Sequence, residues 1–131
     1  QCKKLIPVLC PQCKTSLRTT AIKGREFQLY EKNAEGCPAC KHTGIGGRQL
    51  VMEYLLPVYD ELEAIAEQKW LKVYTVWRAK RLKQTGLSEG FEIKEKTMAA
   101  VLQGRVCATW FQMEFGQVVQ EELEVIVEKI W

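Results

Sequence analysis

The sequence has only one histidine, His42, and four prolines among its 131 residues. A single imidazole without a matching serine and aspartate pattern excludes a Ser-His-Asp triad. The longest purely apolar runs, such as residues 98–102, are far shorter than the roughly 20 residues of a membrane-spanning helix. The phosphate-binding pattern Gly-x-x-x-x-Gly-Lys-[Ser/Thr] is also missing. We therefore expect a chain that neither crosses a membrane nor catalyses a reaction by itself.

Length and composition are those of a folded protein with its own core. Apolar residues make up 47% and charged residues 27% of the chain, which excludes intrinsic disorder. The formal net charge of +3 and the pI near 8.5 are too mild to indicate nucleic-acid binding. The chain opens at Gln1 without an initiator methionine or a signal peptide, and we expect it to be a piece of a longer protein.

Four of the six cysteines form two Cys-x-x-Cys pairs, Cys10 with Cys13 and Cys37 with Cys40, and 23 residues separate the pairs. Each pair places two sulfur atoms on a tight turn, and a hairpin between the pairs can bring all four onto one ion. Four thiolates in tetrahedral geometry favour Zn²⁺, with a single iron ion as the chemical alternative. A disulfide framework is disfavoured because no secretion signal is present. A site closed by four cysteines has no open position, so we predict one structural zinc ion held by these residues.

The single histidine and the two remaining cysteines have simpler interpretations. His42 follows Cys40 by two residues and is expected in an exposed loop or as a hydrogen-bond partner of a ligand, rather than as a ligand. Cys2 and Cys107 fall outside the spacing of the motif and are interpreted as ordinary buried or near-surface thiols.

Charged residues also lie close to the two cysteine pairs. We expect Lys14, Lys41 and Arg48 to neutralise part of the thiolate charge. Arg48 and Glu53 are predicted to form a cross-strand pair beside the site.

The hydrophobic pattern changes its period near residue 57. Strands are predicted over residues 4–9, 26–31 and 48–56. Helices are predicted over residues 60–83, as one helix or as two broken near residues 68–70, and over residues 93–102, 106–115 and 118–131. The predicted fold class is therefore α+β: a small zinc-stapled antiparallel sheet over residues 1–57, followed by a helical region of four to five helices over residues 58–131.

The stretch over residues 60–83 carries its own signals. Asp60 is predicted to be the N-cap and Gly86 the C′ residue, and the basic run at 78–83 is interpreted as a solvated helix end. Aromatic side chains at helical spacing are expected in the core rather than in a binding cage: Trp70, Trp77, Trp110 and Phe111.

The last segment carries an apolar stripe opposite a row of glutamates. Its members recur at spacings of three and four residues: Val119, Leu123, Ile126 and Ile130, widened by Val127 and Trp131. A face this apolar must be covered, and isolated helices this short are marginal. We expect it to dock on the chain's own helices, with docking on another chain as the alternative.

Three local motifs resemble a known family. They are Leu-Cys-Pro-Gln-Cys-Lys at residues 9–14, Gly-Cys-Pro-Ala-Cys-Lys at residues 36–41 and Gly-Arg-x4-Glu-x-Leu-Leu at residues 47–56. Together they resemble the C-terminal region of type II secretion and type IV pilus assembly ATPases, and the similarity covers about residues 4–67. Two features depart from the family pattern. Gly104 is followed by Arg-Val-Cys-Ala-Thr-Trp rather than by Thr-x3-Glu, and residues 117–131 extend past the usual end.

The resemblance implies a non-catalytic zinc-binding region that follows a RecA-like ATPase core. The parent would be a cytoplasmic hexameric ATPase that binds ATP and Mg²⁺ upstream of Gln1 and docks on the cytoplasmic face of the inner membrane. This region would provide structural support and contacts to neighbouring subunits of the homo-hexamer or to the inner-membrane platform protein. Neither nucleic acid nor direct membrane insertion is expected.

Two other functions remain open on sequence alone. A zinc-ribbon nucleic-acid-binding module is one, although the basic residues alternate with acidic ones; salt-dependent binding to DNA or RNA would favour it. A DnaJ-like zinc chaperone module is the other, because Cys37-Pro-x-Cys40-x3-Gly44-x-Gly46 resembles half of its cysteine-rich repeat. That repeat should recur four times, and the first Cys-x-x-Cys pair lacks the following glycines.

Overall fold

The computed structural model describes residues 2–82, 86–87, 89–118 and 120–130, with the backbone alone at Cys2 and Ile130. The elements are, in chain order, β1 (Cys2–Leu9), β2 (Thr15–Ile22), β3 (Arg25–Glu31), the 3₁₀ turn η1 (Pro38–Cys40), β4 (Ile45–Glu53), α1 (Tyr59–Ala66), α2 (Trp70–Ala79), the 3₁₀ turn η2 (Lys80–Leu82), α3 (Ile93–Leu102), α4 (Ala108–Phe115) and α5 (Gln120–Ile130). The predicted α+β class is confirmed, and no helix among these described residues is long and apolar enough to cross a membrane.

The strands form two separate antiparallel ribbons, β1 with β4 and β2 with β3. In the first ribbon Leu9 lies opposite Ile45, next to the cysteine pairs, and Cys2 lies opposite Glu53 at the far end. The second ribbon is a hairpin closed by Lys23 and Gly24, whose positive φ angles of 52° and 76° are those of a type I′ turn.

The three predicted strands are confirmed with shifted ends, because β4 starts at Ile45 and stops at Glu53. The structure adds a fourth strand, β2, which the sequence analysis did not predict. Most side chains of β2 are exposed on both of its faces, so it lacks the alternation of apolar and polar residues that marks a half-buried strand.

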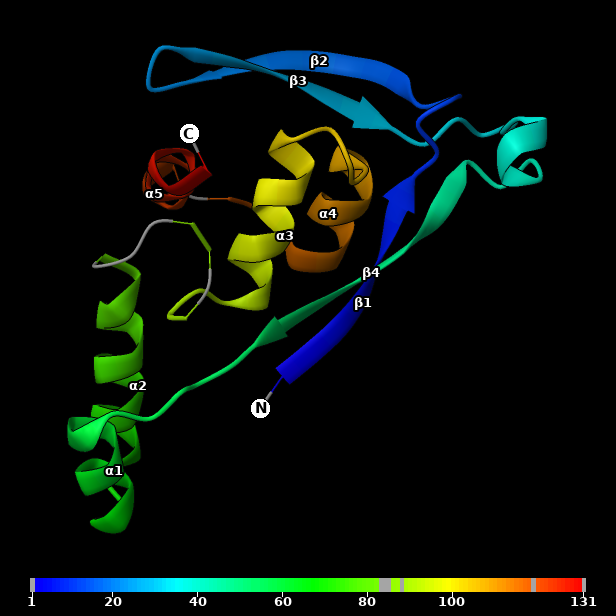
Figure 1. Ribbon diagram of the computed structural model, residues 1–131. Coiled ribbons are helices and arrows are strands. Elements are labelled where there is room, and N and C mark those ends of the chain that lie inside the picture. Colours follow the sequence, from blue (N-terminus) through cyan, green and yellow to red (C-terminus); the bar gives the residue numbers. More distant parts are fainter. Residues whose placement is uncertain (1, 83–85, 88, 119, 131) are drawn as a thin grey trace.

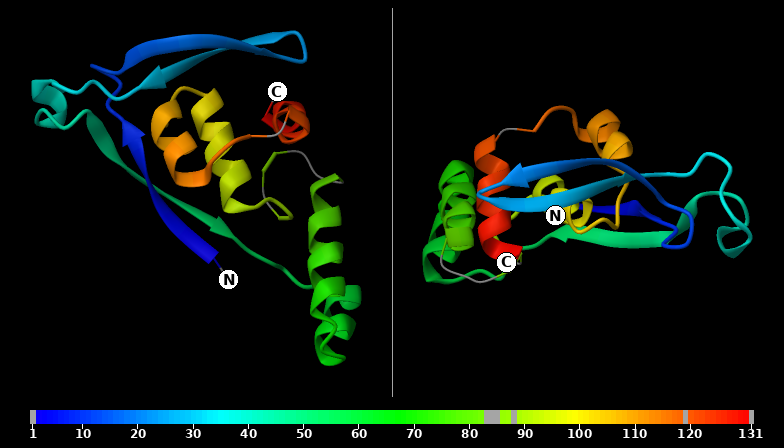
Figure 2. Two further views of the ribbon diagram at one scale, coloured as in Figure 1. Left: turned by 180° about the vertical axis from the view of Figure 1, so that it is seen from behind. Right: turned by 90° about the horizontal axis from the view of Figure 1, so that it is seen from above.

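Helices α3, α4 and α5 lie between the two ribbons, which diverge from the end that carries η1 (Figure 1). The view from behind in Figure 2 shows the same arrangement. The buried core joins Ile6 and Val51 of the first ribbon, Ile22 and Phe27 of the second, and side chains of all three helices, Met98 among them. The regions predicted as 1–57 and 58–131 therefore contribute to one common core.

Helices α1 and α2 form a hairpin beside this core (Figure 1). The predicted break near residues 68–70 is confirmed, since α1 ends at Ala66 and α2 begins at Trp70. The predicted caps are wrong. Val58 occupies the N-cap position, where its N–H donates to Glu61 Oε1 (3.0 Å), and the C-cap of α2 is Lys80, well before Gly86.

Three of the four aromatic residues predicted in the core are buried or half-buried. Trp77 and Phe111 are buried, and Trp110 is half-buried against the core. Trp70 is 62% exposed, so its prediction is wrong. Trp70 does lie on a helix, as its spacing predicts, but α2 is at the edge of the fold and leaves this side chain in solvent. Trp77, on the same helix, is buried and donates from Nε1 to the Tyr54 carbonyl (2.7 Å).

The apolar face of α5 packs on the chain's own core, as expected. Ile126 is fully buried, Val127 is 2% exposed and Leu123 is partly buried against the same cluster. For the buried Ile126 and Val127 the alternative, docking on another chain, is therefore wrong. The other members of the predicted stripe, Val119, Trp131 and the side chain of Ile130, lie outside the described part of the chain.

Candidate metal centre

The two Cys-x-x-Cys pairs meet where the ribbons converge. Cys10 and Cys13 lie in the turn between β1 and β2, and Cys37 and Cys40 lie between β3 and β4, around η1. The four sulfur atoms all lie within 4.8 Å of one another. Residues that are 27 positions apart in sequence thus become neighbours, with Cys10 and Cys40 buried.

The spacing of the sulfur atoms fits a tetrahedral ion. The Sγ–Sγ distances are 3.7 Å for Cys10–Cys37, 3.8 Å for Cys13–Cys40 and 3.7 Å for Cys37–Cys40. A tetrahedron with Zn–S bonds of about 2.3 Å has edges of about 3.8 Å, whereas a disulfide needs about 2.05 Å. All four thiols are accordingly free. The chemistry of this donor set suits one Zn²⁺ or one iron ion.

Backbone N–H groups of the second pair point at a sulfur atom. The amides of Cys37 and Gly44 both lie close to Cys40 Sγ, at 3.3 Å and 3.2 Å, and donate to it. The tight turn behind them depends on Gly36, which has a φ of +67°; a Cβ placed there would lie 2.3 Å from the carbonyl carbon of His42. Glycine at this position is therefore a steric requirement of the turn.

A backbone contact joins the first pair to the chain just after the second pair. The N–H of Cys10 donates to the carbonyl of Gly44 (3.0 Å), and the N–H of Lys14 donates to the carbonyl of Cys10 (3.1 Å). These bonds hold the first turn against the start of β4, so the sulfur positions are set by the backbone of both ribbons.

The four thiols are not equivalent in acidity. Burial raises the pKa of Cys13 to about 12, and hydrogen bonds with the neighbouring thiols add to this effect. Burial also opposes ionisation of Cys40, but the N–H groups of Cys37 and Gly44 outweigh it and lower its pKa to about 6. A thiolate is thus favoured at Cys40 before any cation arrives, and a bound cation would be needed to ionise the whole cluster.

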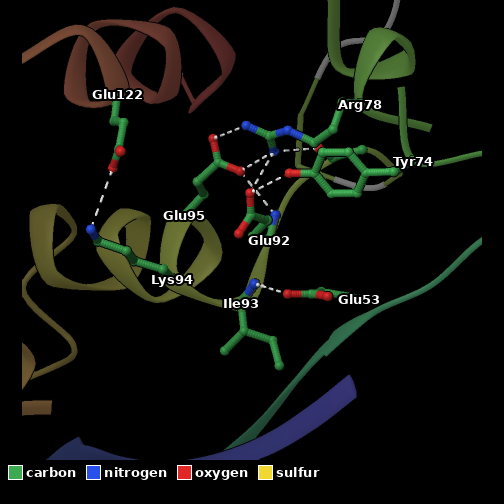
Figure 3. Close-up of polar contacts among 9 residues, drawn as sticks. Glu53, Tyr74, Arg78, Glu92, Ile93, Lys94, Glu95 and Glu122 are labelled. Atoms are coloured by element: carbon green, nitrogen blue, oxygen red, sulfur yellow. Dashed lines mark hydrogen bonds and ion pairs between the residues drawn. The ribbon is translucent and has the colours of Figure 1, made fainter. Parts of the chain in front are cut away.

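The structure confirms one expectation about the residues beside the centre and corrects another. His42 is exposed, as predicted. Arg48 and Glu53 do not form a cross-strand pair, because both lie on β4, opposite Pro7 and Cys2. Glu53 instead accepts a hydrogen bond through Oε1 from the N–H of Ile93 (2.9 Å), at the start of α3 (Figure 3).

The basic residues at the end of α2, Arg78 and Lys80, do not form a solvated helix end, and sequence reasoning missed their partners. Arg78 forms an ion pair with the buried Glu95 and donates to the carbonyl of Gly90 (2.7 Å). Tyr74 donates from its hydroxyl to Glu92 (3.0 Å) in the same network (Figure 3). Glu95 is the buried acidic side chain of this network, because only 5% of the residue is exposed.

Lys80 makes a second such cluster. Its Nζ lies 2.6 Å from the buried Glu61 and 2.8 Å from Glu89, and it donates to the carbonyl of Leu56 (2.9 Å). Burial opposes the charge of Lys80, but the two carboxylates outweigh it and raise its pKa. This cluster could not be predicted from the sequence. Glu61 and Glu89 lie in other segments than Lys80, and no regular spacing along the chain relates them to it.

Comparison with known proteins agrees with the motifs. A family model described as type II/IV secretion system protein matches residues 1–107. The match spans both ribbons, the cysteine cluster and α3, and it stops before α4 and α5. No curated protein and no solved structure matches the chain. The chain belongs to the type II/IV secretion system protein family.

Proposed function

We propose that this chain is the zinc-binding, non-catalytic C-terminal region of a secretion or pilus assembly ATPase. The observation that carries the proposal is the set of four sulfur atoms at tetrahedral spacing in a chain whose family match covers residues 1–107. In this role the metal is structural. It would fix the convergence of the two ribbons, so that α3–α5 can pack between them.

The parent protein would supply the catalytic parts. We propose that ATP and Mg²⁺ bind upstream of this region in a cytoplasmic homo-hexamer. The zinc-binding region then contributes contacts to neighbouring subunits or to an inner-membrane platform protein. Family membership supports this proposal, together with the number of apolar side chains exposed on the α1–α2 hairpin, such as Tyr59 and Leu71.

Metal analysis is the first test. We expect elemental analysis of the purified chain to find about one equivalent of zinc, bound by Cys10, Cys13, Cys37 and Cys40. The variant Cys37→Ser should lose it, and Cys107→Ser, which removes a thiol outside the cluster, should keep it. Iron in place of zinc would change the metal but keep the role. Less than half an equivalent of either metal would contradict the proposal.

Partner binding is the second test. We expect the chain to co-elute with the cytoplasmic domain of the inner-membrane platform protein. The double variant Tyr59→Ser/Leu71→Ser removes exposed apolar surface without touching the core, and it should weaken this association. Failure to associate, combined with salt-dependent binding to DNA or RNA, would instead favour the zinc-ribbon alternative.

A further inference from the structure

The outer edge of β4 is open in the described part of the chain. β4 pairs with β1 on one side, and no backbone group of another described element bonds to its other side. The carbonyl of Met52 points to that side, because it accepts a hydrogen bond from Lys96 Nζ (2.7 Å). Backbone groups alternate along a strand, so Arg48 and Leu50 direct their N–H and C=O to the same open edge.

A groove of about 420 Å³ runs along this edge. One wall is the edge itself, at residues 49–52, and the other is the flank of α3 with the chain that follows it and the end of α5. The lining side chains beyond β4 that matter here are Lys96, Ala99, Gln103, Arg105 and Lys129.

The groove is positively charged. Lys96, Arg105 and Lys129 line it, and no carboxylate occurs among its described lining residues. Burial lowers the pKa of Lys96, and only the more distant Glu53 opposes this effect. No carboxylate of the described chain lies within 4.0 Å of Lys96 Nζ. The ammonium group instead contacts the face of the Tyr54 ring (4.8 Å to its centre) and the Met52 carbonyl.

The ribbon face beside the edge is apolar. Leu50 is 47% exposed and Met52 is 41% exposed, and both point away from the core side of β4, where Val51 is buried. A strand added to this edge would thus have two unlike environments for its alternate side chains. One is the basic groove floor, and the other is the apolar surface of Leu50 and Met52.

We propose that the outer edge of β4 binds an extended, acidic segment of a partner polypeptide as an additional strand. Alternate residues of the segment are Asp or Glu, which meet Lys96, Arg105 and Lys129, and the residues between them are apolar. Residues 48–52 offer room for about five residues of partner, at about 3.4 Å per residue. The carboxylates draw Lys96 away from Met52, which frees its carbonyl for the new strand. The inference is independent of the proposed ATPase role, because it uses only this edge and its charges.

The test uses the zinc-loaded 131-residue chain and a fluorescent peptide of about ten residues that alternates Glu and Val. Fluorescence anisotropy should show saturable binding with a dissociation constant below about 1 mM. The same peptide with Lys in place of Glu should not bind. Lys96→Gln/Arg105→Gln should weaken binding by about tenfold. Arg25→Gln/Lys72→Gln, which removes two exposed cations elsewhere, should leave binding unchanged.

A matched pair of proline variants separates strand addition from simple charge attraction. Leu50→Pro removes the N–H donor at the open edge of β4 and should abolish binding. Leu5→Pro, at the directly opposing position of β1, removes a donor from the other edge and should leave it intact. Circular dichroism and zinc content check that both variants fold. Equal binding to both variants, or displacement of the peptide by phosphatidylglycerol vesicles or inorganic phosphate, would overturn the proposal.

Discussion

The ammonium group of Lys14 donates a hydrogen bond to the carbonyl oxygen of Gly104 (2.8 Å) and lies 4.1 Å from the centre of the Tyr30 ring. We expected Lys14 to neutralise the thiolates, but it contacts the turn between α3 and α4 instead. The N–H of Leu9 donates to the carbonyl of Arg105 (2.8 Å) in the same region. The turn after α3 is therefore bonded directly to the chain around the cysteine cluster.

Replacing Lys14 should destabilise this junction. Lys14→Met keeps most of the aliphatic chain but leaves the Gly104 carbonyl without its charged donor, which should cost about 1–3 kcal/mol in the free energy of unfolding. Urea denaturation measures the loss. Lys3→Met, at an exposed position of β1, is the control and should change stability by less than about 0.5 kcal/mol. Equal stability of the two variants would show that the junction contributes nothing.

The second cysteine turn should not tolerate a side chain at Gly36. In Gly36→Ala the new Cβ would meet the His42 backbone at 2.3 Å, so the turn must open and the sulfur positions must shift. We expect at least tenfold weaker zinc binding in a competition assay with a chromogenic chelator. Gly24→Ala is the control: it has a similar φ of +76° but nothing within 4 Å of the Cβ, so it should lose stability without losing zinc affinity.

Two tryptophans on the same helix should behave in opposite ways. Trp77→Ala removes a buried indole and its hydrogen bond to Tyr54, and should cost about 3–5 kcal/mol. Trp70→Ala removes an exposed ring and should change stability by about 0.5 kcal/mol or less. Thermal denaturation of each variant gives the comparison. Acrylamide should quench the fluorescence of Trp70 far more than that of Trp77, and the reverse order would contradict the placement of α2.

The Lys80 cluster should make stability depend on acid pH. Burial would raise the pKa of Glu89, but hydrogen bonds from Lys80 and from the N–H of Leu56 outweigh it and lower that pKa. A carboxyl with a depressed folded pKa contributes stability above its ordinary pKa of about 4.3, and the contribution is lost as the pH falls through the folded value. Melting temperatures between about pH 7 and pH 3 should thus fall less in Glu89→Gln than in Glu26→Gln, whose acid is exposed. Parallel pH profiles would refute this role of Glu89.

The features that sequence reasoning predicted are those set by neighbours along the chain. The two Cys-x-x-Cys motifs predicted which four sulfur atoms come together, because a tight turn within each motif brings its own two sulfur atoms close. α3 was predicted with its observed ends, since apolar residues such as Met98 and Val101 continue up to Leu102 and Gly104 follows closely. The metal itself stays a prediction, based on the chemistry of four thiols.

The features that were missed depend on contacts between distant segments. Trp70 has the spacing of a core residue, but only the position of α2 at the edge of the fold decides that it is exposed. Arg78 and Lys80 appear in sequence as a basic helix end, and their buried partners Glu95 and Glu61 come from other helices. Such pairs cannot be derived from periodicity, because no repeat along the chain relates their members.

The position of the cysteine cluster at one end of the β1–β4 ribbon has a kinetic consequence. Strands that pair from distant parts of a chain fold slowly, because the loop between them must close before any contact forms. A metal ion that first joins Cys10 and Cys13 to Cys37 and Cys40 closes that loop and places Leu9 beside Ile45. Pairing can then proceed residue by residue from this end toward Cys2 and Glu53, each step adding only local contacts. Refolding should therefore be faster when zinc is present from the start than when it is added after the denaturant is diluted.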